Sequence, residues 1–183
     1  MSKVTVFGAG AWGSTMAQVL CDAGNDVLLW GRNQEVIDEI NGAHTNAKYL
    51  AHHTLPAELK ATSSLDQAFA HSENYVLAIP SSQLRATLKE WKPRFSEGCL
   101  VVSTLKGIEI STQLRMTEVI VEILGPHRVA MITGPNLADE LVLRQPAGAV
   151  AAATTQATSE EVRALFRTPY YRVYTSVDLL GCE

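Results

Sequence analysis

The chain has 183 residues, of which 46% are hydrophobic and 19% are charged, with a formal net charge of −4. This balance is typical of one globular domain, and it argues against a nucleic-acid-binding face, which needs a cluster of basic residues. The apolar runs are too short for a membrane span. Three widely spaced cysteines and the lack of a signal peptide predict reduced thiols in a cytoplasmic protein.

Short apolar stretches alternate along the chain with longer stretches of helical period. We expect strands at Lys3–Phe7, Asp26–Trp30, Tyr75–Ile79, Leu100–Thr104, Val129–Thr133, Ala147–Ala152 and Tyr171–Thr175. We expect helices at Gly10–Ala23, Gln34–Asn41, Ser64–Phe69, Ser82–Trp91, Gln113–Leu124, Asn136–Leu143 and Ser159–Phe166. The alternation predicts parallel strands joined by right-handed crossovers. The expected fold class is therefore α/β, with a doubly wound, mostly parallel sheet and helices on both faces.

The stretch from Gly42 to Ser63 breaks this alternation. It is too long for an ordinary connection and has no clear period, so we expect a loop near the edge of the ligand cleft, with a short strand near Leu59–Thr62. Three histidines fall in it, but they have no cysteine or carboxylate at a useful spacing. We therefore expect no metal site.

A glycine-rich turn follows the first strand, with the sequence Gly8-Ala9-Gly10-Ala11-Trp12-Gly13. Gly8 allows a tight turn, Gly10 lets a pyrophosphate approach the backbone, and Gly13 lets the helix pack on the strand. The helix N-terminus presents free N–H groups to the phosphates. In a strand–turn–helix setting this pattern predicts a Rossmann-type domain, here spanning residues 1–183, that binds NAD(P). The pattern leaves open whether Trp12 packs under the turn or faces the cofactor.

The end of the second strand indicates which cofactor, NADPH or NADH, the domain prefers. A domain that prefers NAD normally has an acidic residue there to bind the ribose 2′-hydroxyl, whereas this chain has Gly31 and then Arg32. A glycine leaves space for a 2′-phosphate, and an arginine pairs with it. We therefore expect NADPH, with NADH as the alternative. The competing interpretation is that Arg32 is an ordinary surface residue.

Three further motifs follow strands and so should face the same cleft. They contain Pro80 with Ser81, Lys106 beside Gly107, and the run from Gly134 through Pro135 to Asn136. Lys106 is placed to reach an anionic or carbonyl substrate. The alternatives are that the serines and Asn136 only cap the helices that follow, and that Lys106 is a solvated surface charge.

Taken together, these motifs resemble the bacterial type of NAD(P)-dependent glycerol-3-phosphate dehydrogenase along essentially the whole chain. The similar stretches, in order, are Gly8–Gly13, Leu29–Arg32, Asn46–Leu50, Leu55–Pro56, Ser103–Glu109, Gly134–Glu140 and Phe166–Glu183. The resemblance implies reversible reduction of dihydroxyacetone phosphate to sn-glycerol 3-phosphate for phospholipid synthesis. It also admits a homodimer of the full-length enzyme.

The resemblance also implies roles for individual residues. The expected cofactor-binding residues are Gly8, Gly10, Ala11, Trp12, Gly13, Arg32, Pro80, Lys106 and Ala138, and the expected substrate-binding residues are Lys106, Gly134 and Asn136. Lys106 is expected to support catalysis, because the family places its proton-donating lysine in a second, helical substrate domain. The last ~10 residues resemble the lead into that domain, so we expect an inactive fragment. The alternatives are the cofactor domain of another two-domain hydroxyacid dehydrogenase or reductase, and a non-catalytic nucleotide-binding module.

Overall fold

The computed structural model describes residues 1–125 and 127–183. At its centre lies an eight-stranded sheet with the order β10-β9-β8-β7-β6-β1-β2-β5. These strands are β1 (Lys3–Phe7), β2 (Asp26–Trp30), β5 (Lys60–Thr62), β6 (Asn74–Leu77), β7 (Leu100–Ser103), β8 (Arg128–Thr133), β9 (Ala147–Ala153) and β10 (Tyr171–Ser176). The helices are α1 (Ala11–Asp22), α2 (Gln34–Ala43), α3 (Leu65–His71), α4 (Leu84–Trp91), α5 (Met116–Leu124), α6 (Ala138–Val142), α7 (Gln156–Phe166) and α8 (Leu179–Cys182).

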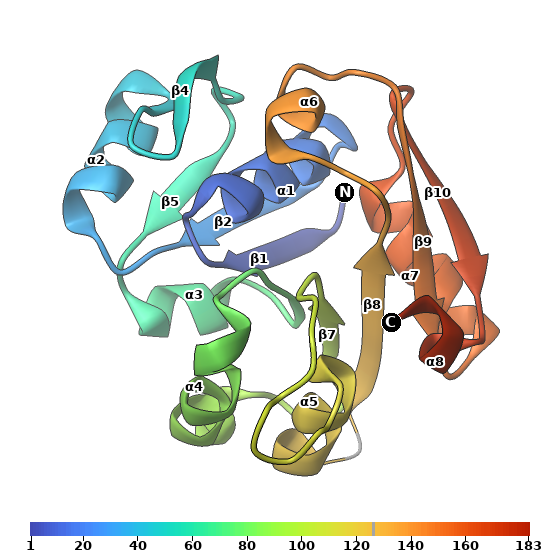
Figure 1. Ribbon diagram of the computed structural model, residues 1–183. Coiled ribbons are helices and arrows are strands. Elements are labelled where there is room, and N and C mark those ends of the chain that lie inside the picture. The colour runs from blue at the N-terminus through green and yellow to red at the C-terminus, as the bar shows by residue number, and fades with distance from the viewer. Residues whose placement is uncertain (126) are drawn as a thin grey trace.

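Helices cover both faces of the sheet, and two buried clusters lie beneath them (Figure 1). Side chains of α1, α2 and α7 form one cluster with the aliphatic face of the strands. Those of α3, α4 and α5 form the other, in which Phe7, Trp30, Tyr75 and Trp91 are all buried. The central strands β1, β6 and β7 are buried on both faces because both faces of the sheet are covered there. The expected doubly wound α/β fold is confirmed.

The chain winds outward from β1 in two directions. It first passes through β2 to β5, and then returns to β6 on the other side of β1 and continues through β7 to β8. All of these neighbouring strands are parallel. The loops that follow β1 and β6 therefore leave the sheet in opposite directions, which opens a crevice at the carboxyl ends of these two strands.

One pair of strands departs from the parallel rule. β9 runs antiparallel to β8, while β10 is again parallel to β9. The connection between β8 and β9 contains only α6, which has five residues. A helix this short does not carry the chain back to the opposite edge of the sheet, as a parallel crossover requires. The parallel crossover expected between these two strands was therefore wrong, whereas the expected mostly parallel sheet is confirmed.

The segment after α2 is more ordered than the sequence suggested. A small antiparallel hairpin, β3 (Thr45–Asn46) and β4 (Leu50–Thr54), occupies most of the expected loop. Leu50 and Leu55 are buried and anchor the hairpin in the first core cluster. The Glu39 carboxylate accepts hydrogen bonds from the Thr45 hydroxyl at 2.6 Å and the Ala47 N–H at 2.7 Å. The loop prediction was wrong for these residues, whereas the short strand expected near Leu59–Thr62 is confirmed as β5.

Other differences concern where helices begin. The fourth expected helix splits into a 3₁₀ turn at Ser81–Gln83 and α4, and no side chain caps either piece, so the serine caps were wrong. Helix α5 begins at Met116, because Gln113 has a left-handed φ of 60°. Helix α7 begins earlier than expected, at Gln156, because the Thr155 hydroxyl accepts the N–H of Thr158. Helix α8 was not predicted.

Candidate functional site

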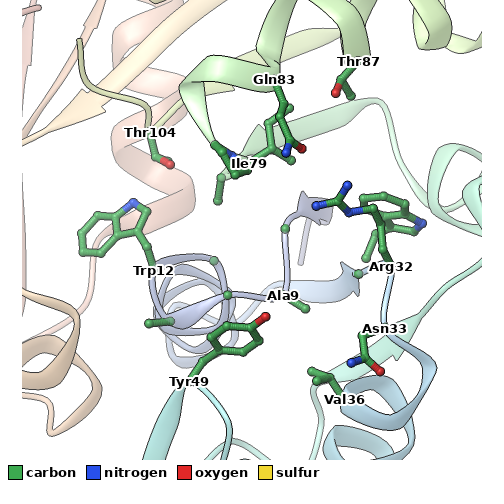
Figure 2. Close-up of a pocket in the computed structure, with 18 of the residues that line it drawn as sticks. Ala9, Trp12, Arg32, Asn33, Val36, Tyr49, Ile79, Gln83, Thr87 and Thr104 are labelled. Atoms are coloured by element: carbon green, nitrogen blue, oxygen red, sulfur yellow. The ribbon is translucent and has the colours of Figure 1, made fainter.

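A cleft of about 710 Å³ lies at the carboxyl ends of β1, β2, β6 and β7 (Figure 2). It occupies the crevice that the reversal of strand order predicts. Most of the predicted cofactor-binding residues line it, namely Gly8, Gly10, Ala11, Trp12, Gly13, Arg32 and Pro80. Two others, Lys106 and Ala138, are not among the residues that line this cleft. A volume of this size lies within the range of small-molecule and cofactor sites, about 300–1,000 Å³.

Two glycines of the turn are required by packing of the protein itself. Gly8 has a φ of 123°, and a Cβ atom there would lie 2.5 Å from the Ala78 carbonyl oxygen. A Cβ atom on Gly13 would lie 1.7 Å from the Gly8 carbonyl oxygen. Real Cβ atoms do not approach oxygen so closely, so any side chain at either position would force apart β1, α1 and the end of β6.

Gly10 is different, because the protein does not need a glycine there. Its φ of −84° and ψ of −175° suit any residue, and a Cβ atom would meet nothing within 4 Å. The space beside it is open and adjoins the N-terminus of α1, where Gly10 is the N-cap and no side chain caps the helix. Free N–H groups and the positive end of the helix dipole make this space suitable for a phosphate. The turn therefore fits a pyrophosphate.

Trp12 combines the two uses that the sequence left open. Its ring is half-buried and packs against the first core cluster, and it also lines the cleft. The indole Nε1 is buried, and it has no hydrogen-bond partner in the part of the chain that the structure describes. Buried indole N–H groups normally have an acceptor. Figure 2 shows Trp12 and Thr104 at one end of the cleft and Arg32 and Asn33 at the other.

The end of β2 forms the second end of the cleft. Arg32 is exposed, and none of the described carboxylates pairs with it, although several other arginines form ion pairs. Asn33 caps α2 by accepting the N–H of Glu35 at 2.9 Å. A Cβ atom on Gly31 would lie 2.6 Å from the Ala9 Cβ atom. Packing against the glycine-rich turn thus already accounts for Gly31, which the sequence argument assigned to space for a phosphate.

Several residues that line the cleft were not singled out as site residues in the sequence analysis. The hairpin contributes Lys48 and Tyr49, and the Lys48 ammonium lies 5.4 Å from the centre of the Tyr49 ring. The end of β7 contributes Thr104, whose hydroxyl donates to the Leu77 carbonyl oxygen at 2.8 Å. The signal for the hairpin was the stretch Asn46–Leu50, which was recognised only as similar to a family loop.

The expected substrate residues lie apart from this cleft. Lys106 is exposed, and its Nζ donates to the Gly134 carbonyl oxygen at 3.0 Å, so the structure brings these two residues together. A Cβ atom on Gly134 would lie 2.5 Å from the Gly148 carbonyl oxygen, where β8 and β9 approach. Asn136 lines a separate cavity of about 210 Å³, and its Nδ2 lies 3.5 Å from the Tyr171 hydroxyl oxygen.

Helix α6 begins later than the sequence predicted. Its N-cap is Leu137, so the alternative that Asn136 merely caps the helix was wrong. Ala138, expected at the cofactor, is the first residue of α6 and packs partly buried against the first core cluster.

The cysteines of the chain are not placed for catalysis. Cys21, Cys99 and Cys182 are free thiols. Burial raises the pKa of the Cys21 thiol to about 12 and that of Cys99 to about 11, so neither is a nucleophile at neutral pH. Residues 1–125 and 127–183 contain no cluster of side chains suited to a metal ion. None of the helices in these ranges has the length and apolar character needed to span a membrane.

Comparisons with known proteins agree on one family. The model of the NAD-dependent glycerol-3-phosphate dehydrogenase N-terminus matches residues 3–159. A glycerol-3-phosphate dehydrogenase [NAD(P)+] of Corynebacterium diphtheriae is 46% identical over 183 residues, covering 99% of this chain and 55% of that protein. A glycerol-3-phosphate dehydrogenase [NAD(P)+] of Streptomyces avermitilis is 43% identical over 183 residues, covering 99% of this chain and 54% of that protein. The chain thus spans about half the length of these curated relatives.

Solved structures give the same fold. The crystal structure of glycerol-3-phosphate dehydrogenase from Coxiella burnetii superposes with a TM-score of 0.90 at 27% identity, covering 98% of this chain and 55% of that one. A pyrroline-5-carboxylate reductase from the same organism reaches a TM-score of 0.71 at 17% identity, over 96% of this chain and 58% of that one. Similarity at so low an identity shows the fold alone.

Proposed function

The chain belongs to the NAD-dependent glycerol-3-phosphate dehydrogenase family, and we propose that residues 1–183 form one domain that binds NADPH. The proposed activity of the whole enzyme is reduction of dihydroxyacetone phosphate to sn-glycerol 3-phosphate, which supplies phospholipid synthesis in the cytoplasm. The homodimer expected for the full-length enzyme stays a prediction, as does the proposed second, substrate-binding domain.

The open space at Gly10 is the observation that supports cofactor binding most directly. A Cβ atom there would meet no protein atom within 4 Å, although the turn around it is tightly packed. The free N–H groups of α1 face an anion in this position. We assign the pyrophosphate to this turn, the adenosine end to Arg32 and Asn33, and the nicotinamide end to Trp12 and Thr104.

Preference for NADPH over NADH rests on Arg32. Its guanidinium is exposed in the cleft and is not paired with any described carboxylate, so it is free to bind a 2′-phosphate. Because Gly31 is explained by packing, the missing strand-end acid contributes less to this inference than Arg32 does.

Titration of both cofactors against Arg32→Ala tests the assignment. We expect NADPH binding to weaken by about 1–3 kcal/mol, the value of a hydrogen bond to a charged group, and NADH binding to change much less. The control is Arg163→Ala, which removes an exposed arginine on α7, outside the cleft. Equal losses for NADPH and NADH on calorimetry would contradict a role of Arg32 at the 2′-phosphate.

The proposed substrate lies beside Lys106 and Gly134. A bound nicotinamide would supply a hydride to the substrate's carbonyl carbon, and negative charge would then develop on the substrate's carbonyl oxygen. The Lys106 ammonium donates a hydrogen bond to the Gly134 carbonyl oxygen at 3.0 Å. In this position we expect it to supply positive charge near the substrate's carbonyl oxygen and to orient the substrate. We assign proton donation to another lysine, because the family resemblance places the proton-donating lysine in a second, helical substrate domain. Lys106 then has a supporting role.

A further inference from the structure

The side chain of Asn46 connects the hairpin to the glycine-rich turn. Asn46 is the last residue of β3 and is fully buried. Its Nδ2 donates to the Ala9 carbonyl oxygen at 3.1 Å and to the Ser14 hydroxyl at 2.9 Å. Both acceptors are more than thirty residues away in the sequence, one in the turn and one in the first turn of α1. A single side chain therefore joins three elements around the proposed phosphate site.

The bond to Ala9 fixes the direction of a peptide plane. The Ala9 carbonyl and the Gly10 N–H belong to the same peptide unit, and the described chain has no cis peptide bond. In a trans peptide these two groups point in opposite directions. Because Asn46 holds the Ala9 carbonyl toward the interior, the Gly10 N–H points away from the interior. No backbone acceptor in the described residues takes this N–H. It remains available on the open side of the turn.

Asn46 also holds the wall of the cleft. Its main-chain carbonyl oxygen, which any residue at this position would supply, accepts the N–H of Tyr49 at 3.1 Å and closes the turn that carries Lys48 and Tyr49 into the cleft lining. From the other side, the Glu39 carboxylate holds the Ala47 N–H at 2.7 Å. The hairpin is thus clamped between α2 and the glycine-rich turn, and Asn46 makes the contact on the turn side.

We propose that Asn46 is a positioning residue for cofactor binding: its side chain directs the Gly10 N–H toward the pyrophosphate and, by anchoring the hairpin to the glycine-rich turn, holds Tyr49 beside the same cofactor. The proposal rests on the proposed function of the cleft. Asn46 itself is buried beneath the turn and acts through Gly10 and Tyr49. An aliphatic residue at this position would fill similar space but would not hold the Ala9 carbonyl. An aspartate would offer only acceptors to that carbonyl oxygen.

The test compares Asn46→Ala with Asn41→Ala in the 183-residue chain. Asn41 is the control, because its exposed side chain also makes two hydrogen bonds, to the N–H and carbonyl of Ala61, but it does not contact the glycine-rich turn. We expect Asn46→Ala to bind NADPH about tenfold more weakly, as the loss of one orienting hydrogen bond would give. We expect Asn41→Ala to lose stability and to keep the wild-type affinity, measured well below both unfolding midpoints.

A double-mutant cycle separates positioning from a merely structural role. Tyr49→Ala is made in the wild-type chain and in Asn46→Ala. If Asn46 acts partly through Tyr49, the second substitution costs less affinity when Asn46 is already gone, whereas a structural role gives additive losses. If Asn46→Ala does not fold, Ser14→Ala replaces it, since it deletes one acceptor of the same side chain. We then expect an affinity loss of about two- to threefold.

The possible outcomes are distinct. A wild-type chain that does not bind NADPH would overturn the proposed function of the cleft. A wild-type chain that binds, together with a folded Asn46→Ala or Ser14→Ala that binds equally well, would overturn the role of Asn46 alone. Additive losses in the cycle would also overturn it. Weaker binding with coupling to Tyr49 would support it.

Discussion

The two parts of the candidate site are built in different ways. Around the glycine-rich turn, buried contacts fix every piece: Gly8 and Gly13 leave no room for a side chain, and Asn46 holds the turn from below. Around Lys106, an exposed side chain meets one carbonyl oxygen. We infer that the part of the site assigned to the nucleotide is preorganised by this domain, whereas the part assigned to the substrate depends on an exposed, solvated group.

The largest expected effects come from the glycines of the turn, where two equal changes should act differently. In Gly13→Val the new side chain collides with the Gly8 carbonyl oxygen. We expect the free energy of unfolding to fall by about 1–3 kcal/mol or more and cofactor binding to be lost with it. In Gly10→Val the new Cβ atom meets nothing within 4 Å. We expect the unfolding free energy to change by less than about 1 kcal/mol, and NADPH binding to be lost.

Urea unfolding and calorimetric titration, run on both variants, measure this contrast. The wild-type chain is the reference for both. Wild-type affinity in a folded Gly10→Val would show that the turn is not the phosphate site. A large stability loss in Gly10→Val would show that the space beside Gly10 is needed by the protein.

A smaller effect on binding is expected in the other half of the site. Lys106→Met removes a positive charge but keeps an apolar chain of similar length, and Lys106 does not line the cleft. We expect NADPH affinity to change by less than about twofold, because the contact at Gly134 is exposed.

Oxidation of NADPH with dihydroxyacetone phosphate sharpens the test of Lys106. If another lysine donates the proton, the 183-residue chain should oxidise NADPH slowly, since a general acid is worth about 10²–10⁴-fold. Rapid turnover that disappears in Lys106→Met would instead make Lys106 the proton donor. The Lys89→Met variant, which alters a lysine in α4 that does not line the cleft, is the control.

The smallest effect is a dependence on pH at the hairpin. Hydrogen bonds from the Thr45 hydroxyl and then the Ala47 N–H lower the pKa of Glu39 below its ordinary value of 4.5. A carboxyl with a lowered pKa stabilises the fold above its unfolded pKa, and this contribution is lost as the pH falls through the folded value. We expect the unfolding midpoint of wild type to fall more steeply than that of Glu39→Gln as the pH drops below about 5. Parallel curves would contradict the clamp.

The sequence predicted the fold because its signals are local and repeated. Apolar strands, a glycine-rich turn and a helix stand close together in the chain, and most strand and helix positions shifted by only one or two residues. The turn residues that line the cleft were also found in this way. The family resemblance then separated this chain from other reductases of the same fold, which the fold alone does not do.

The features that were missed depend on contacts between distant residues. The hairpin is held by Leu50, Leu55 and Asn46, and their partners lie elsewhere in the chain. The antiparallel β9 follows from the shortness of α6, which the predicted helix Asn136–Leu143 concealed. Gly31 faces Ala9 across the turn, a neighbour that no local pattern reveals.

The contact between Gly31 and Ala9 limits how this domain could evolve. In many dinucleotide-binding folds, one acidic substitution at the end of the second strand is a direct route toward NAD. Here that step is obstructed, because even the first atom of a new side chain at position 31 would lie 2.6 Å from the Ala9 methyl group. A change of cofactor would have to begin with a glycine at position 9, or proceed through Arg32 and Asn33. An acidic residue at position 31 is therefore expected only together with a glycine at position 9.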